Sequence, residues 1–376
     1  METYFLKNED ISKFYERINQ EYDLYLPVKV KNPLKAASDS KANLPTDDYS
    51  LKKYAQESKE DFVFNDYRCI EPIKTFLTQY KEEVCNYFEE SDKKGKEGRP
   101  AALCGIKNCD LFSLKVQDYV FLEGTESDPV YKARREGALI ISGDCPHFKE
   151  TCFCRAFDIN PYPSDGFDFN FSPLNNGYLV DAASDKAKVI ISSLRNVLAS
   201  ATLGQISGRA GKRELMLRRL DEHLIQYKIP KKERLQDIIL SGYDSPIWQE
   251  QMRTCVECGG CVFMCATCHC FLLTDEAANN NAKRLRLWDG CMFNNFTRVA
   301  SGANPLKLRY MRLRNRYLKK FDFFITNLGE QACCGCGRCI DVCPGKIDIR
   351  YILRRLDESR TFSENKDVGN NIKGAG

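Results

Sequence analysis

Residues 255–265 read CVECGGCVFMC, and residues 333–344 read CCGCGRCIDVCP. Both contain the spacing C-x2-C-x2-C-x3-C. Because its first three cysteines are each separated by two residues, one tight turn of the chain can bring their thiolates to three corners of a cubic iron-sulfur core. In two-cluster ferredoxins the fourth cysteine of each run binds the other cluster. The spacing therefore predicts two [4Fe-4S] clusters with crossed ligands. One set is Cys255, Cys258, Cys261 and Cys343, and the other is Cys333, Cys336, Cys339 and Cys265.

Zinc is the alternative metal for these stretches, because C-x2-C pairs also bind zinc tetrahedrally. A zinc ribbon needs two separate pairs, whereas here four cysteines run together twice and the second run ends in Cys-Pro. We therefore interpret both runs as iron-sulfur ligands. Glycines between the ligands, such as Gly259 and Gly335, permit backbone angles that other residues avoid and let amide groups point at the sulfurs.

The chain has 376 residues and 19 cysteines, of which 12 lie between 255 and 343. In a reducing compartment such short spacing indicates metal ligation rather than disulfides. The opening METYFLKNEDISKFYERI carries acids and aromatics in place of a signal pattern, and no run approaches 18 apolar residues. We therefore expect a cytoplasmic protein without a membrane span. The net charge of +4 indicates no general attraction to nucleic acid or membranes.

The first half of the chain alternates between strand and helix signals. Apolar runs at 101–106 and 138–143 predict strands with room for a helix between them. Residues 167–184 predict a hairpin that turns at Asn175-Asn176-Gly177. We expect an α/β domain over 1–184, and an α+β, multidomain fold for the whole chain.

The second half is expected to be mainly helical. Apolar residues recur at helical spacing from about 185 to 253. The 67 residues between Cys265 and Cys333 are too many for a compact bacterial ferredoxin. We therefore expect a helical, ferredoxin-like domain with two clusters over 185–360, followed by a flexible tail at 361–376.

A separate group of cysteines lies upstream. Cys109 and Cys145 each follow a predicted strand or its turn, and Cys152-Phe-Cys154 comes soon after. Four thiols converging at strand ends are a reasonable ligand set for a third iron-sulfur cluster or for zinc. The alternative is four buried free cysteines that behave as small hydrophobic residues. We favour a metal.

The remaining cysteines give weaker signals. Cys268, Cys270 and Cys291, in CATCHC and WDGCMF, are candidate cofactor-binding residues near the first cluster. They pack around that cluster, act as alternative ligands or help to hold a further centre, and of these we favour packing. We treat as structural the cysteines without ligand-like spacing, namely Cys69, Cys85, Cys104 and Cys334. With only three histidines, among which His269 lies between two cysteines, no catalytic acid-base site is expected.

The segment KLRYMRLRNRYLKK, residues 307–320, is helical in pattern and strongly basic. Two interpretations are open. In the first, the segment is an ordinary solvated helix face. In the second, its positive charge has a function: it offsets the negative charge of thiolate-bound clusters or docks an acidic partner.

Several stretches together resemble the iron-sulfur beta subunit of cytoplasmic sulfhydrogenases and the A subunit of anaerobic sulfite reductase. They are GIKNCDL, YKARREGALIISGDC, CFC at 152–154, GFDF, GYLVDAAS, CVECGGCVFMCATCHCF, RLWDGC and CCGCGRCIDVCP, which span about residues 100–350. Ala266 departs from the proline that is usual in the family. The resemblance implies a subunit that passes electrons between a flavin and pyridine-nucleotide subunit and a catalytic subunit, without terminal chemistry of its own. It also favours metal ligation by Cys109, Cys152 and Cys154.

The leading hypothesis is a relay of single electrons through [4Fe-4S] clusters, between a flavin/NAD(P)-type subunit and a reductase or hydrogenase subunit. The alternative is a cluster-bearing reductase that acts directly on a sulfur or disulfide substrate with Cys268, Cys270 or His269. A zinc-stabilised nucleic-acid module using 307–320 is disfavoured, because Tyr310 and Tyr317 are its only aromatic residues. We expect no nucleic-acid partner.

Overall fold

The computed structural model describes residues 2–30, 47–55, 64–87, 98–278 and 281–360. The expected tail at 361–376 lies outside these residues.

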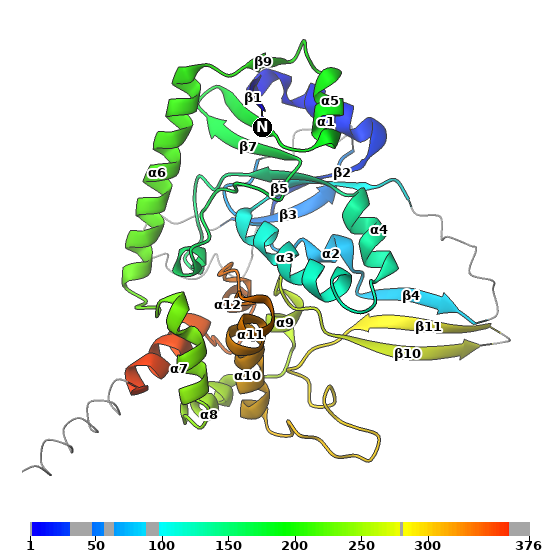
Figure 1. Ribbon diagram of the computed structural model, residues 1–376, viewed down its shortest axis with the longest axis vertical. Helices are drawn as coiled ribbons and strands as arrows, with labels where there is room; N and C mark the ends of the chain where they lie inside the picture. Colours follow the sequence, from blue (N-terminus) through cyan, green and yellow to red (C-terminus); the bar gives the residue numbers. More distant parts are fainter. Residues whose placement is uncertain (1, 31–46, 56–63, 88–97, 279–280, 361–376) are drawn as a thin grey trace, which may run out of the picture.

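The N-terminal part is built on one eight-stranded mixed sheet (Figure 1). Its strands, in spatial order, are β3 (Asp48–Lys53), β2 (Asp23–Val30), β5 (Ala101–Ile106), β6 (Leu139–Gly143), β7 (Phe169–Leu174), β8 (Gly177–Ala182), β1 (Glu2–Lys7) and β9 (Leu198–Ser200). The central strands β2, β5, β6 and β7 run parallel, and their neighbours on both sides run antiparallel. The predicted strands at 101–106 and 138–143 are thus β5 and β6, and the predicted hairpin is β7 and β8.

Helices cover both faces of this sheet. Alternating side chains of β5 point to opposite cores, as the period of a strand requires: Cys104 packs with α1 (Ile11–Glu21) and α5 (Asp185–Ser192). Leu103 packs on the other side with α3 (Asn108–Leu122) and α4 (Pro129–Gly137), close to the short α2 (Lys74–Leu77). Because parallel β5 and β6 are buried on both faces, they have the continuous apolar sequences from which they were predicted.

The C-terminal part is a group of mostly short helices around the cysteine runs. They are α6 (Leu203–Ile225), α7 (Leu235–Ser241), α8 (Ile247–Gln251), α9 (Gly260–Phe263), α10 (Arg309–Leu318), a π-helical turn (Lys319–Phe323), α11 (Phe324–Leu328), α12 (Arg338–Asp341) and a last helix over 349–360. Short 3-10 turns occur at Asn8–Asp10, Cys154–Phe157, Lys232–Arg234 and Met252–Thr254. The core contains Trp248, Tyr317, Phe321 and Leu353, together with Phe153 from the N-terminal half. This C-terminal core is therefore built from residues of both halves.

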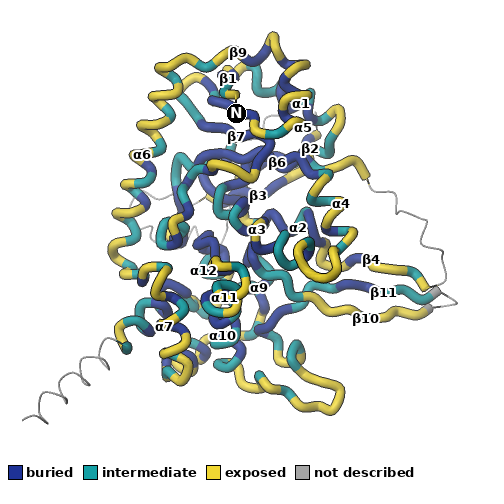
Figure 2. The backbone as a smooth tube through the Cα atoms, viewed as in Figure 1, coloured by how far each residue is buried: buried dark blue, intermediate teal, exposed yellow. Residues whose placement is uncertain are grey.

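α6 links the two parts. A capping box between Thr202 and Gln205 starts this long helix, which runs from the edge of the sheet to the cysteine region (Figure 1). Within it only Met216 and Leu220 are buried, and Figure 2 shows most of its length as exposed or intermediate.

The α+β, multidomain class expected from the sequence is confirmed, but the second half is not made of helices alone. β10 (Phe271–Ala278) and β11 (Asn281–Trp288) form an antiparallel hairpin, and β11 pairs with β4 (Lys81–Asn86) from the N-terminal half. The alternation in LRLW at the end of β11 was a strand signal that the sequence analysis left unassigned.

The sheet also continues past residue 184, where the sequence placed the end of the first domain. α5 packs on one sheet face, and β9 pairs with β1 at the edge. We propose that the first domain extends to Ser200 and that the second begins with α6. Among the described residues, no helix combines the length and the apolar character that crossing a bilayer requires.

Candidate iron-sulfur centres

The first cysteine run folds around a hollow of about 570 Å³. The thiol-bearing residues in its wall are Cys255, Cys258, Cys261, Cys339 and Cys343, and most of the rest is apolar. Four of these five form the first predicted ligand set, so the fold brings Cys343 to the first run although it lies 82 residues after Cys261 in the chain. Gly259 has a φ of +73°, and a Cβ there would meet the Phe293 ring at 2.3 Å. Only glycine therefore fits the turn that leads into α9.

The second predicted ligand set is more deeply buried. Cys265, Cys333 and Cys336 are buried, and Cys339 is half-buried. Burial is the main reason that the pKa of Cys333 is raised to about 11; Lys320 opposes this rise, and the thiols of Cys265 and Cys336 add to it. Burial likewise raises the pKa of Cys339 to about 12, with the other three thiols adding to it. Thr267 and Lys320 both donate to the Ala332 carbonyl, at 2.8 and 2.9 Å, which holds the Cys265 segment next to Cys333. The ligand assignment itself stays a prediction.

Two glycines in the second run lie against the Cys152–Cys154 segment. Gly335, with a φ of +61°, accepts a hydrogen bond at its carbonyl from the Phe153 amide at 2.8 Å. A Cβ on Gly335 would lie 2.5 Å from the Cα of Cys154, and one on Gly337 would lie 2.1 Å from the Thr151 carbonyl oxygen. Backbone atoms cannot yield as a flexible side chain can, so these glycines are required for the two segments to meet.

Buried cations from one helical segment lie beside the ligands. Lys320, in the π-helical turn after α10, donates to the Sγ of Cys265 at 3.3 Å and to the Thr267 hydroxyl at 3.0 Å. One turn earlier, Arg316 donates to the Cys261 carbonyl at 3.2 Å. Neither cation has a carboxylate within ion-pair distance in the described part of the chain. Part of the 307–320 segment thus lies against the thiols, as one of the two interpretations expected, while Lys307 and Arg309 are exposed.

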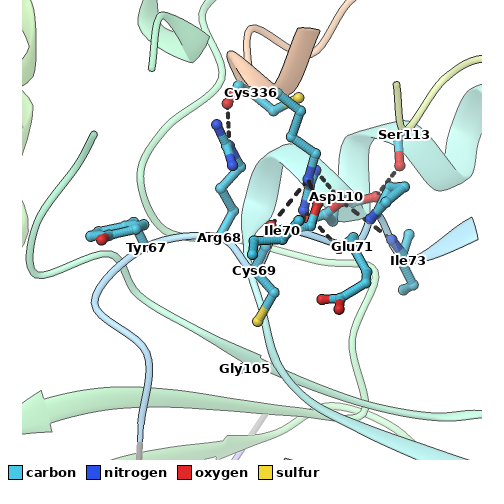
Figure 3. A network of polar contacts seen from close by, with 12 residues as sticks. Tyr67, Arg68, Cys69, Ile70, Glu71, Ile73, Gly105, Asp110, Ser113 and Cys336 are labelled. Carbon is cyan, nitrogen blue, oxygen red and sulfur yellow. Dashed lines mark hydrogen bonds and ion pairs between the residues drawn. The ribbon is translucent and has the colours of Figure 1, made fainter. Parts of the chain in front are cut away.

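An ion-pair network fixes the second run to the N-terminal half (Figure 3). Arg68 donates to the Cys336 carbonyl and to Asp341 at 2.6 Å, which lowers the pKa of Asp341 although burial alone would raise it. Arg338 makes two 2.8 Å bonds to the carboxylate of Asp110, the residue after Cys109 in α3. It also donates to the carbonyls of Cys69, Ile70 and Glu71.

The upstream cysteines line a hollow of their own, of about 390 Å³. Cys109 lies in the first turn of α3 after β5, and Cys145 follows β6. Because parallel strands end at the same edge, these two residues meet Cys152 and Cys154 there, as the sequence suggested. Burial raises the pKa of Cys145 to about 12. Cys336 of the second ligand set lines the same hollow, so the upstream site adjoins the second cluster position.

These hollows fit polynuclear clusters better than single ions. Zinc needs its ligands about 2.0–2.3 Å from one point. Among the described residues, no three cysteine, histidine, aspartate or glutamate side chains converge closely enough to hold one ion. Thiols spaced around an open hollow suit a cubane core, which presents its four irons at separate corners.

Cys268, Cys270 and Cys291 line another hollow, beside Cys265 of the second set. His269 lines it too. The four cysteines that we treated as structural are dispersed: Cys69 and Cys104 are buried, and Cys85 is exposed on β4. Cys334 differs from them, since it is buried beside Cys336, and the interaction of its thiol with Cys336 lowers the pKa of Cys336 to about 6.

Sequence reasoning missed the roles of Arg68, Arg338 and Asp110. Arg338 lies inside a C-x2-C gap, between Cys336 and Cys339, where a charged side chain needs a partner when the gap is buried. That position was the available signal. Arg68 has no comparable signal, because only the fold brings it to Cys336.

The fold and the thiol-lined hollows together define an iron-sulfur protein. A family model described as "4Fe-4S dicluster domain" matches residues 254–347, the stretch that contains both cysteine runs. The match confirms the two [4Fe-4S] clusters expected from the sequence.

The chain is similar along nearly its whole length to "Sulfhydrogenase 2 subunit beta" of Pyrococcus furiosus. The two are 28% identical over 359 residues, which cover 94% of this chain and 98% of that protein. This similarity confirms the resemblance to sulfhydrogenase beta subunits, and it includes residues before 100 that the sequence analysis had left without a recognisable relative.

Proposed function

We propose that this protein is an electron-transfer subunit of a multi-subunit redox complex in the cytoplasm. It relays single electrons between a flavin/NAD(P)-type subunit and a catalytic reductase or hydrogenase subunit, and performs no terminal chemistry itself. Bound [4Fe-4S] clusters supply the one-electron chemistry. The protein supplies their positions, their shielding from water and the charges that set their potentials.

The observation that carries this proposal is that the first hollow and the upstream hollow each include one cysteine of the second ligand set. Cys339, from the second ligand set, also lines the first hollow. Cys336, from the same set, also lines the upstream hollow. The second set therefore lies between the other two sites, which is the arrangement that a relay needs. We accordingly propose that Cys109, Cys145, Cys152 and Cys154 hold a third iron-sulfur cluster.

The exposure of the ligands gives this relay an outer end. Cys258, in the first set, is exposed, while Cys152 in the upstream site is buried. An electron partner that docks over Cys258 would come close to the first cluster. The upstream cluster would then be the one better shielded from solvent.

Metal analysis and EPR of the anaerobically purified full chain test the proposal. The Cys152→Ala/Cys154→Ala variant should lose about four irons per chain while both C-terminal cluster signals remain, since each cubane holds four irons. Cys104→Ala, which removes a buried thiol away from the hollows, is the matched control and should lose none. Zinc without iron in the wild type would contradict the proposal. Steady reduction of a sulfur or disulfide substrate by the isolated chain would favour the reductase alternative.

A further inference from the structure

The hollow beside Cys265 is formed where the β10–β11 hairpin closes. Phe271 pairs with Trp288, so the residues just before β10 and just after β11 are brought together. The Asp289 amide donates to the Cys270 carbonyl at 3.1 Å, and Cys270 and Cys291 line the same hollow. Cys268 lines the same hollow, and its thiol contacts that of Cys265. Three thiols that no cluster motif includes therefore surround one space of about 320 Å³.

A fourth donor faces this hollow from His269. Its Nδ1 lies 3.2 Å from the Thr267 carbonyl oxygen, which can only accept, so Nδ1 carries the proton. With the proton on Nδ1, the neutral imidazole leaves the lone pair of Nε2 free. Metal-ligating histidines are commonly held in this way, with one ring nitrogen donating to a carbonyl.

The charged side chains around the hollow are all positive and need a negative partner. Its wall contains Arg316, Lys319 and Lys320, and no aspartate or glutamate among the described residues. Arg316 and Lys320 are only 4% and 3% exposed. The buried Nε of Arg316 has no hydrogen-bond partner in the described part of the chain. Buried cations are normally paired, and because this wall contains no carboxylate, the counter-charge must come from its thiols in the deprotonated form that binds metal.

We propose that Cys268, Cys270, Cys291 and the Nε2 of His269 hold a further iron-sulfur cluster, adjacent to the second ligand set. A thiolate-bound cluster would supply the missing negative charge. A single zinc ion is disfavoured, because no three of the described side chains converge on one point. The contact between Cys268 and Cys265 would make this site a branch of the relay at the second cluster. The proposal rests on these donors and not on the partners of the relay.

The Cys270→Ala/Cys291→Ala variant of the full chain, purified anaerobically, tests this inference. We expect it to lose about four irons per chain while the two C-terminal cluster signals and the iron held by Cys152 and Cys154 remain. Pulsed EPR should detect a strongly coupled nitrogen in the reduced wild type. His269→Ala should remove this coupling, whereas His269→Cys should remove the coupling and retain the iron.

An alkylation measurement on the wild type keeps the inference testable if the variant does not fold. In the holoprotein Cys270 and Cys291 should react with iodoacetamide far more slowly than the exposed Cys85, and chelation of iron should release them. Reaction as fast as Cys85, unchanged iron in a folded variant, or loss of zinc in place of iron would each overturn the proposal. None of these results depends on electron transfer to a partner, so failure here is distinct from failure of the relay.

Discussion

Replacing Lys320 with methionine should lower the reduction potential of the second cluster. The Lys320 ammonium is buried, donates to the Sγ of the Cys265 ligand, and has no carboxylate partner among the described residues. Reduction adds a negative charge to the cluster, which the ammonium stabilises. Methionine keeps much of the side-chain volume but removes both the charge and the hydrogen bond, so the reduced state loses more stability than the oxidised state.

The size of the shift follows from the contact distance. At the 3.3 Å between Nζ and Sγ, with an effective dielectric constant of about 20, two unit charges attract by about 5 kcal/mol. The added electron is spread over the cluster, and an effective separation of about twice that distance reduces the figure to about 2.5 kcal/mol. At about 2.3 kcal/mol per 100 mV, this corresponds to a fall of roughly 100 mV.

An EPR-monitored redox titration of the anaerobic full chain measures this shift for each cluster. Lys307→Met is the matched control, because Lys307 is an exposed lysine in the same basic segment, and it should move no potential by more than about 20 mV, since exposed charges are screened. Lys320→Arg should recover much of the loss. A Lys320→Met variant with full iron content and unchanged potentials would refute the argument that this buried charge sets the potential.

Three further predictions test other contacts around the clusters. Arg316→Gln should lower the potentials of both clusters in the same titration, because Arg316 lies beside Cys261 of the first set and Cys265 and Cys339 of the second; a shift confined to one cluster would contradict this placement. Gly335→Ala should sharply reduce the iron content, whereas Gly329→Ala, where a φ of +76° adds strain but no atom lies within 4 Å, should retain it; equal iron in both variants would be the negative result. Asp110→Ala leaves Arg338 buried and unpaired and should destabilise the holoprotein by about 3–5 kcal/mol in chemical unfolding. Removing the exposed Asp275 from its pair with Arg284 should cost about 1 kcal/mol or less, and similar losses for the two variants would refute the reasoning.

The elements predicted well from sequence were those with strong local signals. Strands β5 and β6 have continuous apolar runs, and the β7–β8 hairpin has an Asn-Asn-Gly turn. The cysteine spacing identified two clusters because three ligands of each lie within one turn of the chain. The upstream group was found for a related reason, since Cys109 and Cys145 follow adjacent parallel strands whose ends must meet.

What the sequence could not reveal depends on contacts between distant segments. β11 is stabilised by β4, from which it is separated by nearly 200 residues, and no local pattern encodes that pairing. The hollow formed by Cys268, Cys270 and Cys291 depends on the same hairpin, so the sequence grouped these cysteines but could not show that they surround one space beside Cys265. Arg68 and Asp110 reach the second run only through the assembled fold.

The net charge of +4 concealed the main electrostatic feature of the protein. Arg316 and Lys320 are buried against thiols without carboxylate partners in the described residues, whereas Arg312, buried on the same helix as Arg316, is paired with Glu257. In a chain without clusters, burying such unpaired cations would cost more free energy of hydration than their interactions with the surrounding groups recover. Bound clusters make the burial favourable, because their thiolate ligands are negatively charged and pair with Arg316 and Lys320. The basic segment is therefore understood as part of the iron-sulfur sites, and the fold around it should depend on iron as strongly as the clusters depend on the cysteines.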